Sequence, residues 1–315
     1  MNDLAPPQRS LGHAQAWVTQ PERGTFRLLR AMRVLSLRCG RPVSRIVLIL
    51  VVAYFWLRPG AAASHIARFQ RRALARRPTR RDLFSNLLAF GTCVHDRVFL
   101  LNNRIADLCL EITNEELLVQ ALDHGSGCFL MGAHLGSFEV LRALGERHSG
   151  VSVVMAMYPE NARKIDAALA AITPGAVADI IRLGSLDAML QLRSRLDQGA
   201  FVGVLGDRTL ADEPVLNVTF LGTPAAFPIG PWRAAALLRR PVLFIAGLYC
   251  GGNRYQLIVE QLADFSHTDQ STREPAIHAA IVRYAGVLEA ICRSHPYNWF
   301  NFFDFWHELP GSQGS

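Results

Sequence analysis

The sequence predicts an α/β protein with a mixed, largely parallel sheet flanked by helices. From about residue 82 onward, short apolar segments alternate with segments of helical period, which is typical of this class. The chain has 315 residues, 50% of them apolar and 19% charged, so it can bury a large core and is not disordered. Because no apolar run reaches about 18 residues, a polytopic membrane protein is excluded.

The spacing of apolar residues, and the residues that typically start or end helices and strands, place the elements in the first half of this domain. We expect, in order, a helix over 83–101, a helix over 115–123, a strand over 128–131, a helix over 136–147 and a strand over 151–157. The first helix is predicted to bury one apolar stripe, made of Leu83, Leu87, Phe90, Val94 and Val98.

The second half continues the alternation. We expect a helix capped by Ser185 and ended by Gly199, a strand over 201–205, a loop, a helix over 231–239, strands over 241–249 and 255–260, and a last helix. The helix after Ser185 is predicted to face inward with Leu186, Met189, Leu190 and Leu196. The last helix is predicted to open on a capping box of Ser271 and Glu274 and to bury Ile277, Ile281, Tyr284, Leu288 and Ile291. Since no repeat or linker interrupts these elements, residues 82–310 are predicted to be one domain.

The net charge of +7 is unevenly distributed. Residues 1–81 carry 16 arginines and two acidic residues, a net +14, whereas residues 82–315 carry a net −7. The apolar run Ile46–Leu57 lies inside this basic segment. As a helix it would extend about 18 Å, less than the roughly 30 Å of the hydrocarbon core.

We therefore expect residues 1–81 to be an Arg-rich helical membrane anchor that dips into one leaflet and binds an anionic membrane surface. The alternative is an ordinary buried helix. Nucleic acid is not expected as a partner, because the aromatic residues of this segment lie in the apolar run and not between the arginines.

Several other classes of protein are excluded by the motifs that the sequence lacks. The six cysteines form no C-x2-C pair and mostly lie in apolar surroundings, so we expect reduced thiols in a cytosolic compartment and no metal site. The chain has no G-x-S-x-G elbow, G-x-G-x-x-G fingerprint or P-loop. A serine hydrolase and a nucleotide cofactor are therefore not indicated.

The candidate catalytic residues are His134 and Glu139, at a predicted strand-to-helix turn where ligands gather in such folds. A neutral histidine is a competent base near pH 7, and a carboxylate on its far nitrogen fixes the tautomer. Gly132 and Gly136 would let the chain fold back so that Glu139 meets the imidazole. We also expect backbone N–H groups at the helix start to stabilise an oxyanion.

Four segments together resemble a known family. They are the Gly132–Glu139 segment GAHLGSFE, the Val202–Arg208 segment VGVLGDR, the Phe220–Ala235 segment FLGTPAAFPIGPWRAA and the Pro296–Trp306 segment PYNWFNFFDFW. In this order and spacing they resemble the lysophospholipid acyltransferase superfamily, in its branch of late acyltransferases of lipid A biosynthesis. The resemblance spans about residues 83–308, and the basic, apolar N-terminus before it is similar to that branch as well.

The resemblance implies a glycerolipid acyltransferase-like fold and roles for individual residues. It makes His134 the general base and Glu139 the residue that orients it, with no metal or cofactor. It also implies that Asp207 and Arg208 support the cleft or bind the acceptor. The remaining candidates for substrate binding are Gly136, Ser137 and Phe138 in the first motif and Gly222, Phe227 and Gly230 in the third. Arg163 and Arg182 are candidates for holding a phosphate or a carrier protein, with simple solvation as the alternative.

The sequence also departs from the branch. Ser137-Phe138 stands where the branch commonly has Asn-Trp, and an aromatic run over 298–306 replaces an Arg-rich one. We expect this run to form an aromatic surface for a flat or lipidic partner, similar to acyltransferases of aryl polyene or related pigment-lipid pathways.

The sequence thus predicts a monotopic acyltransferase on the cytoplasmic face of the bacterial inner membrane. The expected partners are acyl carrier protein, as the donor of a fatty or polyene acyl group, and a lipid or glycolipid acceptor with a free hydroxyl. The alternatives are an acyl-thioester hydrolase on the same fold and a non-catalytic, membrane-binding scaffold.

Overall fold

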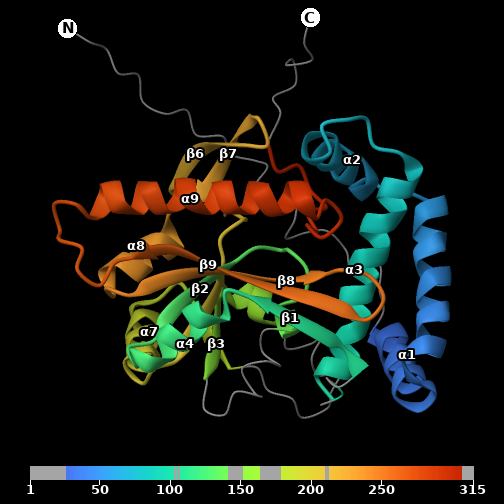
Figure 1. The fold of residues 1–315 in the computed structure, drawn as a ribbon, viewed down its shortest axis with the longest axis horizontal. Coiled ribbons are helices and arrows are strands. Elements are labelled where there is room, and N and C mark those ends of the chain that lie inside the picture. Colours follow the sequence, from blue (N-terminus) through green and yellow to red (C-terminus); the bar gives the residue numbers. More distant parts are fainter. Residues whose placement is uncertain are drawn as a thin grey trace, which may run out of the picture.

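The computed structural model describes residues 26–102, 104, 107–140, 152–163, 179–209 and 213–306. Its helices are α1 (Phe26–Leu57), α2 (Ala62–Ala73), α3 (Arg80–Leu100), α4 (Glu115–Asp123), α7 (Leu186–Asp197), α8 (Gly230–Leu237) and α9 (Arg273–Ser294). Figure 1 shows α1, α2 and α3 gathered at one end of the sheet, with α9 lying along it.

Seven strands form a mostly parallel sheet in the order β1-β9-β8-β2-β5-β3-β4. They are β1 (Cys109–Thr113), β2 (Cys128–Gly132), β3 (Val153–Met157), β4 (Ile180–Arg182), β5 (Phe201–Leu205), β8 (Pro241–Tyr249) and β9 (Arg254–Asp264). Only the β8–β9 pair is antiparallel. The strands β6 (Val215–Phe220) and β7 (Thr223–Pro228) form a separate antiparallel hairpin. The predicted fold class is confirmed.

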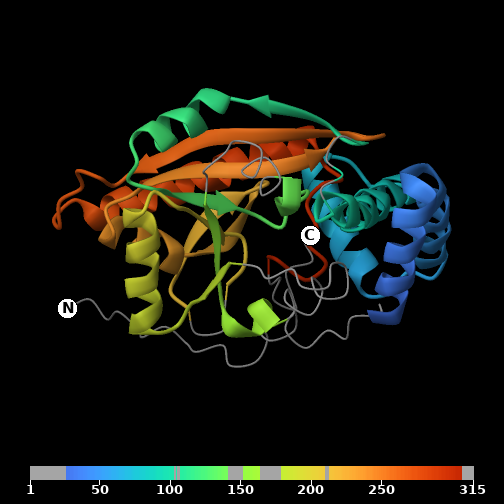
Figure 2. The same ribbon diagram turned by 90° about the horizontal axis from the view of Figure 1, so that it is seen from below.

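The sheet is buried on both faces, as expected for parallel strands. Successive side chains of a strand alternate between the faces. Phe129 and Met131 of β2 pack with α2, α7, α8 and α9 in the larger core. Cys128 and Leu130 pack with α3 and α4 in a second core. Figure 2 shows α4 and α7 on opposite sides of the sheet.

Most of the predicted elements are present, several with the predicted ends. The helix over 115–123 and the strands over 201–205 and 241–249 agree residue for residue. Ser185 caps α7 by accepting a hydrogen bond from the N–H of Ala188, as predicted. The predicted helix over 136–147 starts two residues late, because Gly136 and Ser137 are not helical, and it is described as helix only over Phe138–Val140. Three strands with short or weakly apolar sequences were not predicted, namely β1, β4 and β6, and neither were β7 and α2.

One predicted buried face and one predicted cap need correction. On α7, Leu186 is 79% and Leu190 60% exposed, so only part of the predicted inward stripe is buried. The predicted capping box on α9 is wrong, because the helix begins at Arg273 and its N-cap Thr272 makes no side-chain capping bond. The five apolar residues predicted inside α9 are all buried.

The inner face of α3 mixes polar and apolar side chains. Of its predicted stripe only Val98 is buried, and Phe90 is 37% exposed. The buried side chains instead include Asp82, Asn86, His95 and Asp96. This helix packs against other polar side chains of α1 and β9, which a hydrophobic period does not reveal.

Helix α1 is longer than the predicted 12-residue run and bends at Gly40, where φ is 76° and Pro42 follows. It packs along α3, where Gly91 lets Leu48 and Val52 approach closely. By length and composition alone, α1 from Arg30 and α9 are apolar enough to cross a membrane. Helix α9 is a core helix, because 44% of its most apolar 18-residue stretch is buried. In α1 the corresponding share is 17%.

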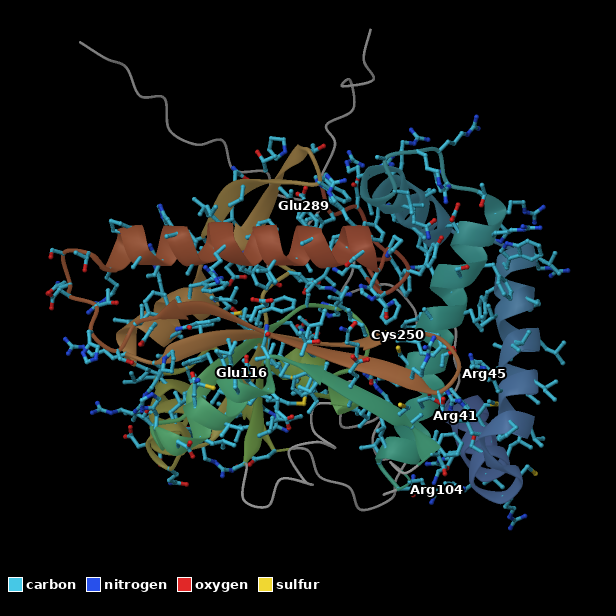
Figure 3. All side chains as sticks on the ribbon, in the orientation of Figure 1. Arg41, Arg45, Arg104, Glu116, Cys250 and Glu289 are labelled. Atoms are coloured by element: carbon cyan, nitrogen blue, oxygen red, sulfur yellow. The ribbon has the colours of Figure 1, made fainter. Side chains whose placement is uncertain are left out.

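A buried ion pair fastens α1 to the rest of the chain. The guanidinium of Arg41 binds both carboxylate oxygens of Asp96 on α3, at 2.8 and 2.9 Å, and Tyr255 of β9 donates a hydrogen bond to the same carboxylate. Arg41 and Arg45 also donate to the carbonyl of Gly252 at the tip of the β8–β9 hairpin. In Figure 3 both arginines point from α1 toward that hairpin.

Candidate active site

His134 and Asp207 lie side by side because their strands are neighbours. In the parallel β2–β5 pair, Gly132 is in register with Leu205. Each of the two polar residues follows its strand end by two positions, so both leave the sheet at the same edge. The sequence separates them by 73 residues.

The carboxylate of Asp207 holds the imidazole ring of His134. Its Oδ1 is 2.9 Å from Nδ1 of His134, and its Oδ2 accepts the backbone N–H of His134 at 2.9 Å. The same Oδ2 accepts the indole N–H of Trp299 at 3.0 Å. An ionised carboxylate only accepts hydrogen bonds, so Nδ1 carries the proton and Nε2 is the basic nitrogen.

The environment fixes the charges of this pair. Burial lowers the pKa of His134 below its ordinary value, and Asp207 only partly opposes this. Burial would raise the pKa of Asp207, but His134, Arg208 and Trp299 outweigh it and lower that pKa to about 2. At neutral pH the pair is therefore a neutral imidazole beside a carboxylate, the state that a general base requires.

Backbone hydrogen bonds and a close backbone contact fix the turn after His134. Gly136 has φ +65°, and an added Cβ would lie 2.0 Å from the carbonyl oxygen of Gly247. The N–H of Gly136 donates to the carbonyl of Asn298 at 2.9 Å, and that of Ser137 donates to Gly247 at 2.7 Å. Because these N–H groups already have acceptors, the predicted oxyanion site is not provided by Gly136 or Ser137.

Glu139 is paired with another residue than predicted. Its Oε1 is 3.1 Å from Nε of Arg97 on α3. The carboxylate on the imidazole is that of Asp207, so the prediction that Glu139 orients His134 is wrong. The H-x4-E spacing placed both residues near one turn, but the neighbouring strand supplied a carboxylate closer to Nδ1.

His134 opens onto a cavity of about 840 Å³. Most of its wall is apolar and comes from β3, β5, α7 and α8, including Met155, Met157, Met189 and Leu192. The polar or charged side chains of the wall include Arg97, His134, Glu139, Arg208 and Glu213. A volume of this size with a few grouped polar residues is typical of a small-molecule or lipid site.

The sequence of the chain matches a family model over much of this structure. Residues 94–308 match the bacterial lipid A biosynthesis acyltransferase family. The chain belongs to this family. The match covers the cavity, the His134–Asp207 pair and most of the sheet, and it supports a lipid acyltransferase activity. No curated protein sequence matches the chain.

The other predicted site residues of this acyltransferase divide into two groups. Phe138, Arg208 and Gly230 line the cavity. Ser137 is buried beside it, Phe227 lies in the core against Tyr284, and Gly222 forms the turn of the β6–β7 hairpin. Arg163 and Arg182 are exposed and do not belong to the described wall of the cavity.

The aromatic run near the C-terminus lies mostly in the core, with Trp299, Phe300 and Phe305 buried and Phe302, Phe303 and Trp306 half-buried. Trp299 is 1% exposed and packs edge-on against Phe69, Phe220 and Phe305. The buried part of the run, including Trp299, does not form the predicted aromatic surface for a flat partner. Sequence reasoning missed Trp299 and Arg97, because each acts through a contact between distant segments.

Two further observations concern metals and thiols. Within the described ranges, no group of three or more His, Cys, Asp or Glu side chains is placed to hold a metal ion. All six cysteines are free, although Cys39 and Cys109 are exposed rather than buried.

Proposed function

We propose that this acyltransferase moves an acyl chain from a thioester to a hydroxyl group of a lipid or glycolipid, with His134 as general base. Nε2 of His134 takes the proton of the acceptor hydroxyl as its oxygen attacks the thioester carbonyl carbon. The tetrahedral intermediate then collapses and the C–S bond breaks. The leaving sulfur takes the proton from the imidazolium, so the base is regenerated.

The observation that carries this proposal is the His134–Asp207 pair at the wall of an apolar cavity. Asp207 keeps the proton on Nδ1 and stabilises the imidazolium that forms during transfer. Its second oxygen is held by Trp299 and by the backbone of His134, which fixes its orientation.

The donor is proposed to be an acyl carrier protein thioester. The methionine- and leucine-rich wall of the cavity suits an acyl chain, whether fatty or polyene. Exposed arginines around the end of α2 and the start of α3, such as Arg71, Arg77 and Arg81, would attract an acidic carrier.

The acceptor is proposed to be a lipid or glycolipid of the lipid A type. The family match supports this choice. A pigment-type lipid is less favoured, because the aromatic residues Trp299, Phe300 and Phe305 near the C-terminus are buried and cannot form a surface for it.

Residues 1–81 are proposed as the membrane-associating segment and 82–310 as the catalytic part, on the cytoplasmic face of the inner membrane. Large apolar side chains at Val43, Ile46, Leu50, Tyr54 and Leu57 are 47 to 65% exposed along one face of α1. After the bend, the 17 residues to Leu57 extend only about 25 Å, less than a hydrocarbon core of about 30 Å. This geometry favours monotopic insertion into one leaflet.

The decisive experiment replaces the base. We expect His134→Ala to lower acyl transfer from an acyl carrier protein thioester by at least about 100-fold, without loss of the folded state. Transfer is measured by mass spectrometry of the acylated lipid, and folding by circular dichroism. Full activity of the variant would refute the assignment, and thioester loss without any lipid product would favour a hydrolase.

A further inference from the structure

Glu139 has hydrogen-bonding capacity that the folded chain does not use. An ionised carboxylate has about four acceptor sites on its two oxygens. Arg97 occupies Oε1 at 3.1 Å. Oε2 is buried and has no hydrogen-bond partner among the described residues. An unpaired buried carboxylate oxygen is destabilising, so its retention calls for an explanation.

Orientation of His134 does not explain this carboxylate. Nδ1 of the imidazole is already bound to Asp207 at 2.9 Å. Asp207 is itself held at its second oxygen by two further donors, the backbone N–H of His134 and the indole of Trp299. The orientation of the His134 imidazole is therefore fixed without a contact to Glu139.

The position of Glu139 points to a ligand instead. Glu139 and Arg97 line the same cavity as His134. The side chain of Glu139 is only 11% exposed, whereas that of Arg97 is 31% exposed. The last torsion of a glutamate is soft, so a small rotation presents either oxygen to the cavity while the ion pair is kept. The pair thus combines an unfilled acceptor with a donor that still reaches solvent.

We propose that Glu139 and Arg97 form the subsite that binds the acyl acceptor, and that Glu139 accepts a hydrogen bond from the acceptor. The ligand would be a polyhydroxylated head group, with a hydroxyl or amide N–H beside the hydroxyl that is acylated. Arg97 would donate to a neighbouring carbonyl or phosphate oxygen of the same head group. This inference rests on the proposed transferase function, but it gives Glu139 a binding role in place of an orienting one.

The test compares binding and turnover for Glu139→Gln and Asp207→Asn in the full chain. The probe is an under-acylated lipid A precursor in detergent micelles, titrated in the absence of donor. We expect Glu139→Gln to raise the Kd for this lipid, and its KM in acyl transfer, at least about 10-fold. Asp207→Asn should instead lower kcat and leave the Kd within about twofold.

The matched control is Glu116→Gln, the same exchange at an exposed residue of α4 (Figure 3) that is not among the described residues lining the cavity. It should leave Kd, KM and kcat unchanged. An unchanged Kd for Glu139→Gln, or a loss of kcat alone that parallels Asp207→Asn, would overturn the inference. Failure of the wild-type protein to bind the precursor would overturn it as well. Binding without any transfer by the wild-type protein would count against the proposed function and not against this subsite.

Discussion

At the scale of single residues, the chemistry depends on contacts between segments that are distant in sequence. His134 and Asp207 are 73 residues apart, and Trp299 lies a further 92 residues beyond Asp207. The sequence singled out His134 as the candidate base but assigned Glu139, close to it along the chain, as its partner. The neighbouring strand β5 brings a carboxylate closer than the following helix does, and that geometry decides the partner.

The first prediction concerns pH. The base works only when neutral, and burial lowers the pKa of His134 below its ordinary 6.5. Activity should therefore persist below pH 6.5 and fall as the pH drops through the lowered pKa. The measurement is kcat/KM for acyl transfer between pH 4.5 and 8 in buffers of constant ionic strength. An acid limb centred above pH 6.5 would contradict the burial argument.

The second prediction concerns the turn after His134. Gly136→Ala should destabilise the protein by at least about 3 kcal/mol, because a positive φ and a backbone clash coincide there. Gly222→Ala is the matched control, since Gly222 also has a positive φ, of +80°, but open space around it. It should cost only about 1 kcal/mol. Urea unfolding measures the free energy of unfolding of both variants. Equal losses of stability would mean that the backbone shifts to relieve the clash at position 136.

At the scale of elements, α1 has two different faces. One face carries Ser44, Leu48 and Val52 into the contact with α3, and Arg41 binds Asp96 beside it. The opposite face is apolar and exposed. A buried, bidentate ion pair costs much when one partner is lost, so α1 is expected to stay docked on the domain while its outer face meets the lipid.

The third prediction tests this outer face. The triple variant Ile46→Asn, Leu50→Asn, Tyr54→Asn should lower binding to anionic vesicles by at least about 100-fold, because each large apolar side chain contributes about 1.5 to 3 kcal/mol when buried. Vesicle co-sedimentation measures binding. Val119→Asn with Val282→Asn, at exposed apolar positions of α4 and α9, serves as control. Equal binding by the triple variant would place the anchor elsewhere.

At the scale of the whole molecule, the parallel strand ends, α7 and α8 enclose one large cavity around the base. The wall combines residues from most of the chain between Arg97 and Ala234. Under the proposed function this cavity holds the acyl chain, so the space between its lining side chains limits the length of chain that fits.

The fourth prediction concerns chain length. Ala188 on α7 lines the cavity and is 3% exposed, so Ala188→Phe would fill part of it. The ratio of transfer rates for a long to a short acyl donor should fall at least about 10-fold. Leu190→Phe on the exposed side of α7 is the control and should leave the ratio unchanged. An unaltered ratio in Ala188→Phe would mean that the acyl chain lies elsewhere.

The sequence by itself determined the fold class, most sheet strands, the candidate for the general base and the family resemblance. These follow from local signals: hydrophobic period, helix caps and short motifs. Only the tertiary structure decided that Asp207 holds the imidazole, that Glu139 pairs with Arg97, and that the aromatic run lies mostly in the core. Each of these depends on which strands become neighbours, and strand order is set by packing of the whole sheet, which no local pattern encodes.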